Sequence, residues 1–180
     1  MPLSATDSSL RIGLAGLGRF GQLHAGVLAD LPGVALAALA DTDPQRLAEV
    51  AERHGVTARY GDALELIADD SLDAVVLATP DEQHGHQARA ALARGRHLFV
   101  EKPLAAAWQE AMDLQRLATQ AGLILQTGLI LRYESSHRWL QHQIAAGAFG
   151  DLVSIRARRN CSRTSFAAIA AVRVSPVTMV

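Results

Sequence analysis

Short apolar runs alternate with longer amphipathic segments along the first two thirds of the chain. The apolar runs have the length of strands and are continuous, which is typical of parallel strands covered on both faces. The segments between them have the length of helices and end at turn residues such as Gly55, Gly95 and Gly122. This alternation predicts an α/β fold, a doubly wound parallel sheet with helices on both faces.

Each predicted strand is a short apolar stretch that ends at a turn. The predicted strands cover residues 10–15, 34–40, 57–60, 73–78, 96–100 and 123–127. The predicted helices fill the gaps, at residues 19–31, 44–54, 63–67, 82–94 and 108–121. Asp43, Asp62 and Asp81 stand where helix N-caps are expected, because a carboxylate there accepts hydrogen bonds from free backbone N–H groups.

The pattern changes after residue 127. A helix over 134–146 and an alternating strand over 151–159 are predicted, and they resemble the start of a second, α+β unit. The hydrophobic residues over 162–180 show no clear helix or strand period. We therefore expect a flexible leader over 1–9, an α/β domain over 10–126, and the truncated start of a further domain over 127–180.

Composition narrows the function classes. The chain has 180 residues, of which 49% are hydrophobic and 19% charged, so a packed core is expected rather than disorder. The net charge of −1 gives no electrostatic reason to expect nucleic acid or an anionic membrane as partner. The N-terminus lacks a basic signal-peptide region, no apolar run reaches about 18 residues, and the single Cys161 fits a reducing compartment. We expect a cytoplasmic protein without a metal site.

A glycine motif joins the first predicted strand to the first helix. It has the pattern G-x-G-x-x-G and consists of Gly16, Leu17, Gly18, Arg19, Phe20 and Gly21. Glycine permits the tight turn, the close approach of a pyrophosphate to the backbone, and close packing of helix on strand. The motif predicts a Rossmann domain whose helix N-terminus binds a dinucleotide. The alternative is an ordinary strand-to-helix turn that happens to hold three glycines.

Asp41 ends the second predicted strand, about 20 residues after the motif, where an acidic residue binds the adenosine ribose. Its carboxylate would repel the 2′-phosphate of NADP. Thr42 rather than an arginine follows, so no cation is expected there for a phosphate. The charge argument therefore favours NAD, with NADP less favoured. The alternative is a turn aspartate, although Asp43 already provides the helix cap.

Polar residues also follow the fourth and fifth predicted strands. They are Thr79, Pro80 and His84 after the fourth strand, and Glu101 and Lys102 after the fifth. Ligands of doubly wound sheets lie at the carboxyl ends of the strands, so these residues should face the cofactor. A lysine there can donate a hydrogen bond to a substrate hydroxyl or carbonyl. The alternatives are a solvated loop lysine at Lys102 and an exposed or capping histidine at His84.

Taken together, these segments resemble the Gfo/Idh/MocA oxidoreductases. The resemblance covers about residues 10–160, and the matching pieces are Ile12–Gly21, Ala40–Asp41, Ala78–Pro80 with His84, Phe99–Leu104, Thr127–Gly128 with Arg132, and Gly147–Val153. The Glu101-Lys102-Pro103 motif is the most specific of them.

The resemblance implies reversible oxidation of a sugar or cyclitol hydroxyl, with hydride passing to the nicotinamide. It implies that Lys102 is the catalytic lysine, that Glu101 lies beside the nicotinamide, and that a cis peptide at Pro103 helps to fix the lysine. Thr79, Pro80 and His84 would line the cofactor cleft. The C-terminal region would be the place of any homo-oligomer contact.

The chain also departs from the family pattern. Members continue into an open-sheet domain with a substrate histidine, and the chain stops before that pattern; His137 and His142 have the spacing of a solvated helix face instead. Ile130 stands where the family often has a polar residue. A dinucleotide-binding fragment or sensor without turnover is therefore the alternative function. A methyltransferase using S-adenosylmethionine is less favoured, because it has no need of Glu101-Lys102-Pro103.

Overall fold

The computed structural model describes residues 9–157. The contacts of the chain divide it into two units, one ending at Tyr133 and the other beginning at Glu134, and each is described here by itself. The expected leader lies, apart from Ser9, outside the described residues. The domain boundary expected after residue 126 falls inside the first unit. The functions expected for the segments on either side of residue 126 stay predictions.

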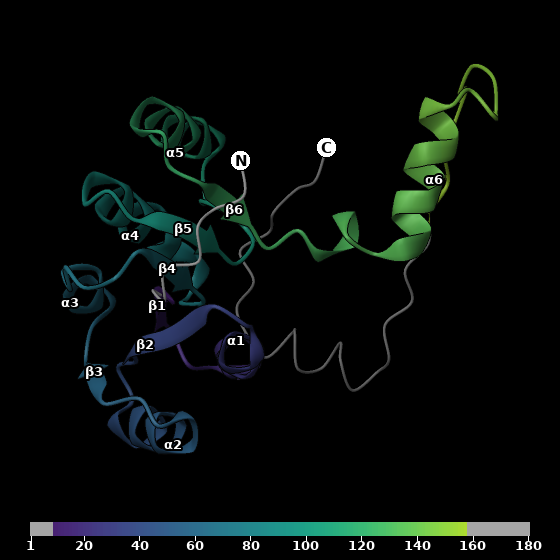
Figure 1. The fold of residues 1–180 in the computed structure, drawn as a ribbon. Helices are drawn as coiled ribbons and strands as arrows, with labels where there is room; N and C mark the ends of the chain where they lie inside the picture. The colour runs from purple at the N-terminus through teal and green to yellow at the C-terminus, as the bar shows by residue number, and fades with distance from the viewer. Residues whose placement is uncertain (1–8, 158–180) are drawn as a thin grey trace. The chain divides into compact units, whose positions relative to one another are not determined.

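The first unit is a six-stranded sheet in which every neighbouring pair of strands is parallel (Figure 1). The strands, in chain order, are β1 (Leu10–Ala15), β2 (Val34–Ala40), β3 (Ala58–Tyr60), β4 (Ala74–Leu77), β5 (His97–Val100) and β6 (Leu125–Thr127). Their order in the sheet is β3-β2-β1-β4-β5-β6. The chain thus leaves β1 toward one edge and then returns to build the other half from β4. That reversal between β1 and β4 is the position at which such sheets bind ligands.

Helices connect the strands and cover both faces of the sheet. They are α1 (Arg19–Asp30), α2 (Pro44–His54), α3 (Ala63–Ile67), α4 (Asp81–Ala93) and α5 (Trp108–Ala121), followed by a 3-10 turn, η1 (Ile130–Arg132). One buried cluster joins the sheet to α1 and α2, and the other joins it to α3, α4 and α5. Leu14 and Leu77, both without exposed surface, lie in the first and second cluster respectively. The predicted doubly wound fold is confirmed.

The ends of the helices follow the predicted chemistry with one exception. Asp43 accepts hydrogen bonds from two backbone N–H groups at the start of α2, and Asp62 accepts one at the start of α3. Gly55 and Gly122 end their helices in the left-handed region, each with φ of 67°. The prediction that Asp81 caps α4 is wrong, because Pro80 holds the cap position and Asp81 lies inside the first turn. An acidic residue in the first turn still stabilises the helix, because its negative charge lies near the positive end of the helix dipole.

The second unit contains one described helix, α6 (Ser135–Ala145). The predicted strand over 151–159 is wrong for residues 151–157, which form no regular structure, while residues 158–159 lie outside the described part. A strand needs a partner for its backbone N–H and C=O groups, and no described residue pairs with this segment. Val153 and Ile155 are accordingly 97% and 62% exposed. No helix within residues 9–157 is long and apolar enough to cross a membrane.

Candidate cofactor site

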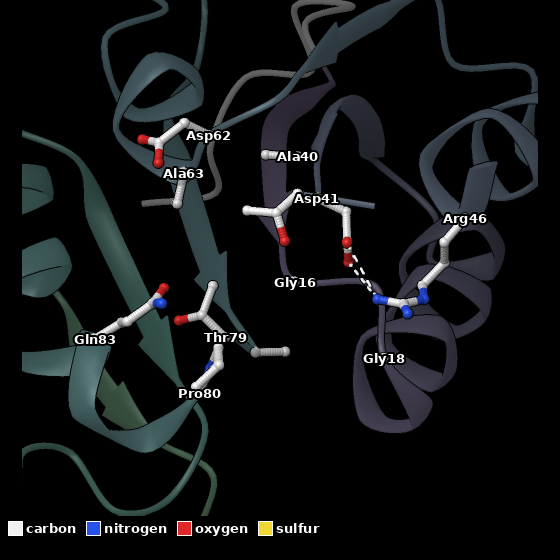
Figure 2. Close-up of a pocket in the computed structure, with 12 residues that line it drawn as sticks. Gly16, Gly18, Ala40, Asp41, Arg46, Asp62, Ala63, Thr79, Pro80 and Gln83 are labelled. Atoms are coloured by element: carbon white, nitrogen blue, oxygen red, sulfur yellow. Dashed lines mark hydrogen bonds and ion pairs between the residues drawn. The ribbon is translucent and has the colours of Figure 1, made fainter. Parts of the chain in front are cut away.

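A cleft of about 290 Å³ opens at the carboxyl ends of β1, β2 and β4. Its wall includes the glycine turn after β1, the residues that follow β2, and the loop after β4 (Figure 2). The lining residues used below are Gly16, Gly18, Asp41, Arg46, Thr79 and Pro80. The cleft therefore lies at the strand-order reversal, where the sequence predicts the dinucleotide.

The three glycines of the turn meet different surroundings. Gly16 has φ of +84°, and a Cβ added to it would overlap the backbone of Ala78 in the neighbouring strand end. A Cβ at Gly21 would overlap the carbonyl oxygen of Gly16, so glycine is required where α1 meets the turn. A Cβ at Gly18 would meet no atom within 4 Å. The fold thus explains Gly16 and Gly21, whereas Gly18 borders open space on the cleft.

Helix α1 begins at this turn without a side-chain cap. Gly18 is the N-cap residue and the first turn carries no acidic side chain, so backbone N–H groups there keep their capacity for an anion. Arg19 and Phe20 are exposed, whereas the side chain of Leu17 is fully buried in the core. The Leu17 N–H is not free, because it donates to Asp41 Oδ2 at 2.6 Å.

Asp41 is held by three donor groups. Its side chain is 5% exposed. Besides the Leu17 N–H, it accepts the N–H of Asp43 at 2.8 Å. One guanidinium nitrogen of Arg46 donates to both of its oxygens, at 3.1 and 3.3 Å (Figure 2). The second guanidinium nitrogen of Arg46 lies 2.9 Å from Asp43 Oδ2. The group formed by Asp41, Asp43 and Arg46 therefore carries a net charge of −1.

A cation lies beside Asp41, although the sequence predicts none there for a phosphate. That prediction rests on Thr42, the next residue, whereas Arg46 reaches the carboxylate from the first turn of α2. The sequence did hold a signal, since Asp43 caps the helix and Arg46 is three residues later, on the face that returns toward the cap. The guanidinium is already paired with two carboxylates, so its charge is not free for a phosphate.

The loop after β4 carries a chain of neutral hydrogen bonds. The Thr79 hydroxyl donates to Gln87 Oε1 at 2.6 Å, and the Gln87 amide donates to Gln83 Oε1 at 3.0 Å. Thr79, Pro80 and Gln83 line the cleft. Gln83 was not anticipated from the sequence, although its place in the first turn of α4, next to Pro80, could have indicated it.

His84 does not line this cleft. Its side chain is fully buried, and its two ring nitrogens lie 2.9 Å from the carbonyl oxygen of Thr79 and 2.6 Å from that of Pro103. The histidine thus connects the loop after β4 with the loop after β5 from beneath. The expectation of a cleft-lining or exposed residue is corrected, because the inward face of α4 carries His84 into the core between the two loops.

The loop after β5 places a carboxylate beside a lysine. Glu101 is 9% exposed and lies 2.8 Å from His24 Nε2, on α1, while it also accepts the Lys102 N–H at 3.2 Å. Lys102 is exposed, and within residues 9–157 its amino group makes no ion pair or hydrogen bond. The Lys102–Pro103 peptide is cis, as the family resemblance implies.

His24 was missed in the sequence. It lies one helical turn after Gly21 and next to Ala25, both buried, and this spacing could have placed it at the sheet. Its ring also packs edge-on against Phe99, with ring centroids 5.2 Å apart. Gly128 completes this group, since a Cβ there would approach Glu101 Oε1 to 3.1 Å. Elements α1, β5 and β6 therefore meet at the Glu101 carboxylate.

No group of three or more His, Cys, Asp or Glu within residues 9–157 could hold a metal ion. The polar groups instead form two sets at the same edge of the sheet. One surrounds the cleft near Gly18 and Asp41, and the other surrounds Glu101 and Lys102.

Residues 10–129 match the NAD-binding Rossmann fold of the oxidoreductase family that includes Gfo, Idh and MocA. The chain belongs to the Gfo/Idh/MocA oxidoreductase family. The resemblance read from the Gly16–Gly21 and Glu101–Pro103 motifs is thereby confirmed, and a methyltransferase is excluded.

Similar proteins show how this Gfo/Idh/MocA chain relates to its family. It is 36% identical over 138 residues to 4-carboxy-2-hydroxymuconate-6-semialdehyde dehydrogenase of a Sphingobium species, covering 77% of this chain and 44% of that protein. It is 30% identical over 145 residues to scyllo-inositol 2-dehydrogenase (NAD(+)) of Bacillus subtilis, covering 80% and 42%. The crystal structure of scyllo-inositol dehydrogenase from Lactobacillus casei with bound NAD(H) and scyllo-inositol superposes with a TM-score of 0.75 at 29% identity, covering 79% and 43%.

These Gfo/Idh/MocA relatives are more than twice as long as the matched part, since the chain spans only 42–44% of each of them. The match covers the Rossmann half, which holds the cleft, the glycine turn and the Glu101-Lys102-Pro103 loop.

Proposed function

We propose that the chain is the NAD-binding half of an oxidoreductase that transfers hydride between a sugar or cyclitol hydroxyl and nicotinamide. The observation that carries the proposal is the cleft at the β1/β4 reversal, which joins an uncapped helix N-terminus to a buried carboxylate. Inositol dehydrogenases among the relatives support a polyol substrate.

The residues of the cleft fit a dinucleotide. The open space beside Gly18 and the free N–H groups at the start of α1 suit a pyrophosphate. The Asp41 carboxylate accepts about four hydrogen bonds, and two of its present contacts come from one Arg46 nitrogen, at 3.1 and 3.3 Å. Ribose hydroxyls would take the place of these two longer contacts, leaving Arg46 paired with Asp43. In this proposal the backbone of residues 16–21 binds the pyrophosphate, while Thr79 and Pro80 form the opposite wall.

NAD is the proposed cofactor in preference to NADP. Asp41, Asp43 and Arg46 retain a net negative charge, and a 2′-phosphate would add about two more at the same place. Arg46 reduces this repulsion without reversing it, since both of its pairing nitrogens are used. We therefore expect a moderate preference for NAD rather than an absolute one.

Lys102 is the proposed catalytic residue at the reacting end. The nicotinamide, when bound, accepts or supplies the hydride. The Lys102 amino group holds the reacting hydroxyl and assists movement of its proton, for which an exposed amino group without a partner among residues 9–157 is suited. Glu101, held by His24 and by the Lys102 N–H, fixes the backbone from which the lysine extends.

A second candidate function is dinucleotide binding without turnover, as a module or sensor. The described part of the second unit, residues 134–157, supplies one helix and no sheet that could enclose a substrate. For the 180-residue chain we expect saturable NADH binding with weak or absent turnover of polyols such as inositol.

Fluorescence titration with NADH and a spectrophotometric assay with NAD and inositol separate the two candidates. Lys102→Ala should keep the NADH affinity within a few fold and remove any turnover. Robust turnover that is abolished in Lys102→Ala would rule out the non-catalytic module, whereas turnover that survives in the variant would rule out the role of Lys102.

A further inference from the structure

Gln83 lines the cleft, yet the proposed chemistry gives it no task. Its side chain ends the series of hydrogen bonds that begins at Thr79. The Thr79 hydroxyl donates to Gln87 Oε1 at 2.6 Å, and the Gln87 NH2 group donates to Gln83 Oε1 at 3.0 Å. Gln87 is only 3% exposed, so it is held in place by its surroundings. The series therefore fixes the orientation of the Gln83 amide.

The Gln83 amide offers a hydrogen-bond donor to the cleft. Its oxygen is taken by Gln87, whereas its NH2 group has no hydrogen-bond partner within residues 9–157. A primary amide has two N–H donors at this end and no acceptor. The free end of Gln83 therefore suits a ligand atom that accepts a hydrogen bond.

Asp62 lines the same cleft and offers an acceptor. As the N-cap of α3 it accepts the Leu64 N–H at Oδ1, at 2.7 Å. Its second oxygen, Oδ2, makes no hydrogen bond or ion pair with any residue that the structure describes. The helix cap thus uses one carboxylate oxygen and leaves the other for a ligand.

The fold places this donor and this acceptor where the base of a dinucleotide would lie. Helix α3 follows β3, the outer neighbour of β2, so its start lies beyond Asp41 for a ligand that begins at the glycine turn. Figure 2 shows Asp62 and Gln83 on one side of the cleft, with Asp41 and Arg46 on the other. With the pyrophosphate at Gly18 and the ribose at Asp41, the base attached to that ribose enters the space between these two sides.

The donor and the acceptor match the edge of adenine that is farthest from the sugar. On that edge the ring nitrogen N1 accepts a hydrogen bond and the N6 amino group donates one. Hypoxanthine has the opposite pattern, since its N1 carries a hydrogen and its C6 carries a carbonyl oxygen. With hypoxanthine, a donor would face the Gln83 NH2 group and an acceptor would face the Asp62 carboxylate. A site built on hydrogen bonds rejects a ligand that leaves its polar groups unpaired.

We propose that Gln83 and Asp62 are specificity residues that recognise the base of the dinucleotide. Gln83 donates to N1 of adenine, and Asp62 accepts from the N6 amino group. This inference rests on the proposed function, because it requires a dinucleotide in the cleft. Gln83 is half-buried and Asp62 is exposed, so each hydrogen bond contributes about threefold to the affinity. Adenine should therefore bind about tenfold more tightly than hypoxanthine.

Fluorescence titration of the wild-type chain with two probes tests the proposal directly. One probe is NADH, and the other is its analogue with hypoxanthine in place of adenine. Both have the same diphosphate, sugars and nicotinamide, so the ratio of the two Kd values reports on the base alone. The analogue should bind about tenfold more weakly. Equal affinities, or tighter binding of the analogue, would overturn the inference and leave the proposed function intact.

Two conservative variants should reverse the pattern of donor and acceptor. Gln83→Glu keeps an oxygen for Gln87 and presents an acceptor to the base. Asp62→Asn keeps a residue suited to the helix cap and presents a donor. Either variant alone should make the two probes bind about equally, and the double variant should prefer the analogue. Any general effect of the added or lost charge falls on both probes and leaves their ratio unchanged.

Gln115→Glu is the matched control, because it makes the same chemical change at an exposed position of α5 outside the cleft. It should keep the wild-type ratio, and thermal unfolding checks that each variant folds. A wild-type ratio that persists in both Gln83→Glu and Asp62→Asn would overturn the roles of these residues. A wild-type chain that binds neither probe would contradict the proposed function itself.

Discussion

The Asp41 carboxylate has two tasks in the cleft, one structural and one proposed for the cofactor. It joins the glycine turn to the start of α2 through Leu17 and Arg46. Because its side chain is 5% exposed, loss of the carboxylate leaves the Leu17 N–H without this partner and leaves Arg46 paired with Asp43 alone. The same loss removes the negative charge that opposes a 2′-phosphate and releases Arg46 to meet one.

Asp41→Ala should therefore weaken NAD binding by about tenfold or more and raise the relative affinity for NADP. In Asp41→Ala/Arg46→Ala the gain for NADP should disappear, since the freed cation is gone. Calorimetric titration with both cofactors measures this, with Glu49→Ala on the exposed face of α2 as control. Unchanged affinities for both cofactors in Asp41→Ala would exclude the ribose role.

The pair of His24 and Glu101 allows a separate test of stability. Their side chains are 21% and 11% exposed, so removal of the imidazole leaves a largely buried carboxylate with the Lys102 N–H as its remaining donor. His24→Ala should lower the free energy of unfolding by about 1–3 kcal/mol. Urea unfolding measures the loss.

Glu101→Gln in the His24→Ala background should recover part of that loss, because the uncompensated charge is removed. His86→Ala, at an exposed site, should change little. If His24→Ala proves as stable as His86→Ala, the pair does not contribute to the fold.

Two glycines of the turn between β1 and α1 allow separate tests of stability and of cofactor binding. Gly21→Ala places a methyl group against the Gly16 carbonyl, so the backbone must shift and the free energy of unfolding should fall by about 2 kcal/mol or more. Gly18→Ala meets no atom within 4 Å and should fold like the wild type, yet it fills the space proposed for the pyrophosphate. Thermal unfolding and NADH titration of both variants check this contrast. A Gly18→Ala chain that binds NADH as tightly as the wild type would contradict the site.

Helix α6 has a pH-sensitive start. Hydrogen bonds from Ser136 and His137 lower the pKa of Glu134 from 4.5 to about 2. A lowered carboxylate pKa means that the capping contribution is present above pH 4.5 and is lost as the pH falls toward 2. The protection of the His137 amide in the wild type, measured by NMR as its exchange rate relative to that of an unprotected amide at the same pH, should therefore fall over this range.

In Glu134→Gln the His137 amide should lack this change at the same acid pH. A Glu134 carboxyl that titrates at 4.5, its ordinary value, would contradict the described cap.

The sequence predicted the elements well where a local signal decided them. Strand β4 is a continuous apolar run, and α2 has both an Asp43 cap and a Gly55 end, so their limits follow from nearby residues. The strand predicted over 151–159 is absent from 151–157, the described part of it, because alternation shows only that a segment could face a core. Whether a partner strand stands beside it depends on distant parts of the chain.

The site was predictable where a motif fixes the backbone and not where side chains meet across elements. Gly16, Gly21 and the cis peptide at Pro103 follow from their motifs. For Arg46 and His24 the helix spacing could indicate the face on which they lie, whereas their carboxylate partners follow from how the helices pack beside the strand ends. The burial of His84 likewise depends on two loops that are 24 residues apart, counted from Thr79 to Pro103.

The first unit contains every residue proposed to contact the cofactor, from Gly16 to Lys102, within Met1–Tyr133. The expected homo-oligomer contact through residues 127–180 stays a prediction, as does a cytoplasmic location. Family membership and fold therefore rest on residues 10–129, while substrate and turnover depend on tests of function.

The backbone amides at the start of α1 are the most direct place to look for the cofactor. A two-dimensional ¹H–¹⁵N NMR titration with NADH should give saturable shifts at Gly18, Arg19, Phe20 and Gly21 and at the Leu17 amide that Asp41 holds, with the amides of α6 unmoved. Absence of any saturable shift, or shifts confined to residues outside the cleft, would contradict a dinucleotide site at this turn.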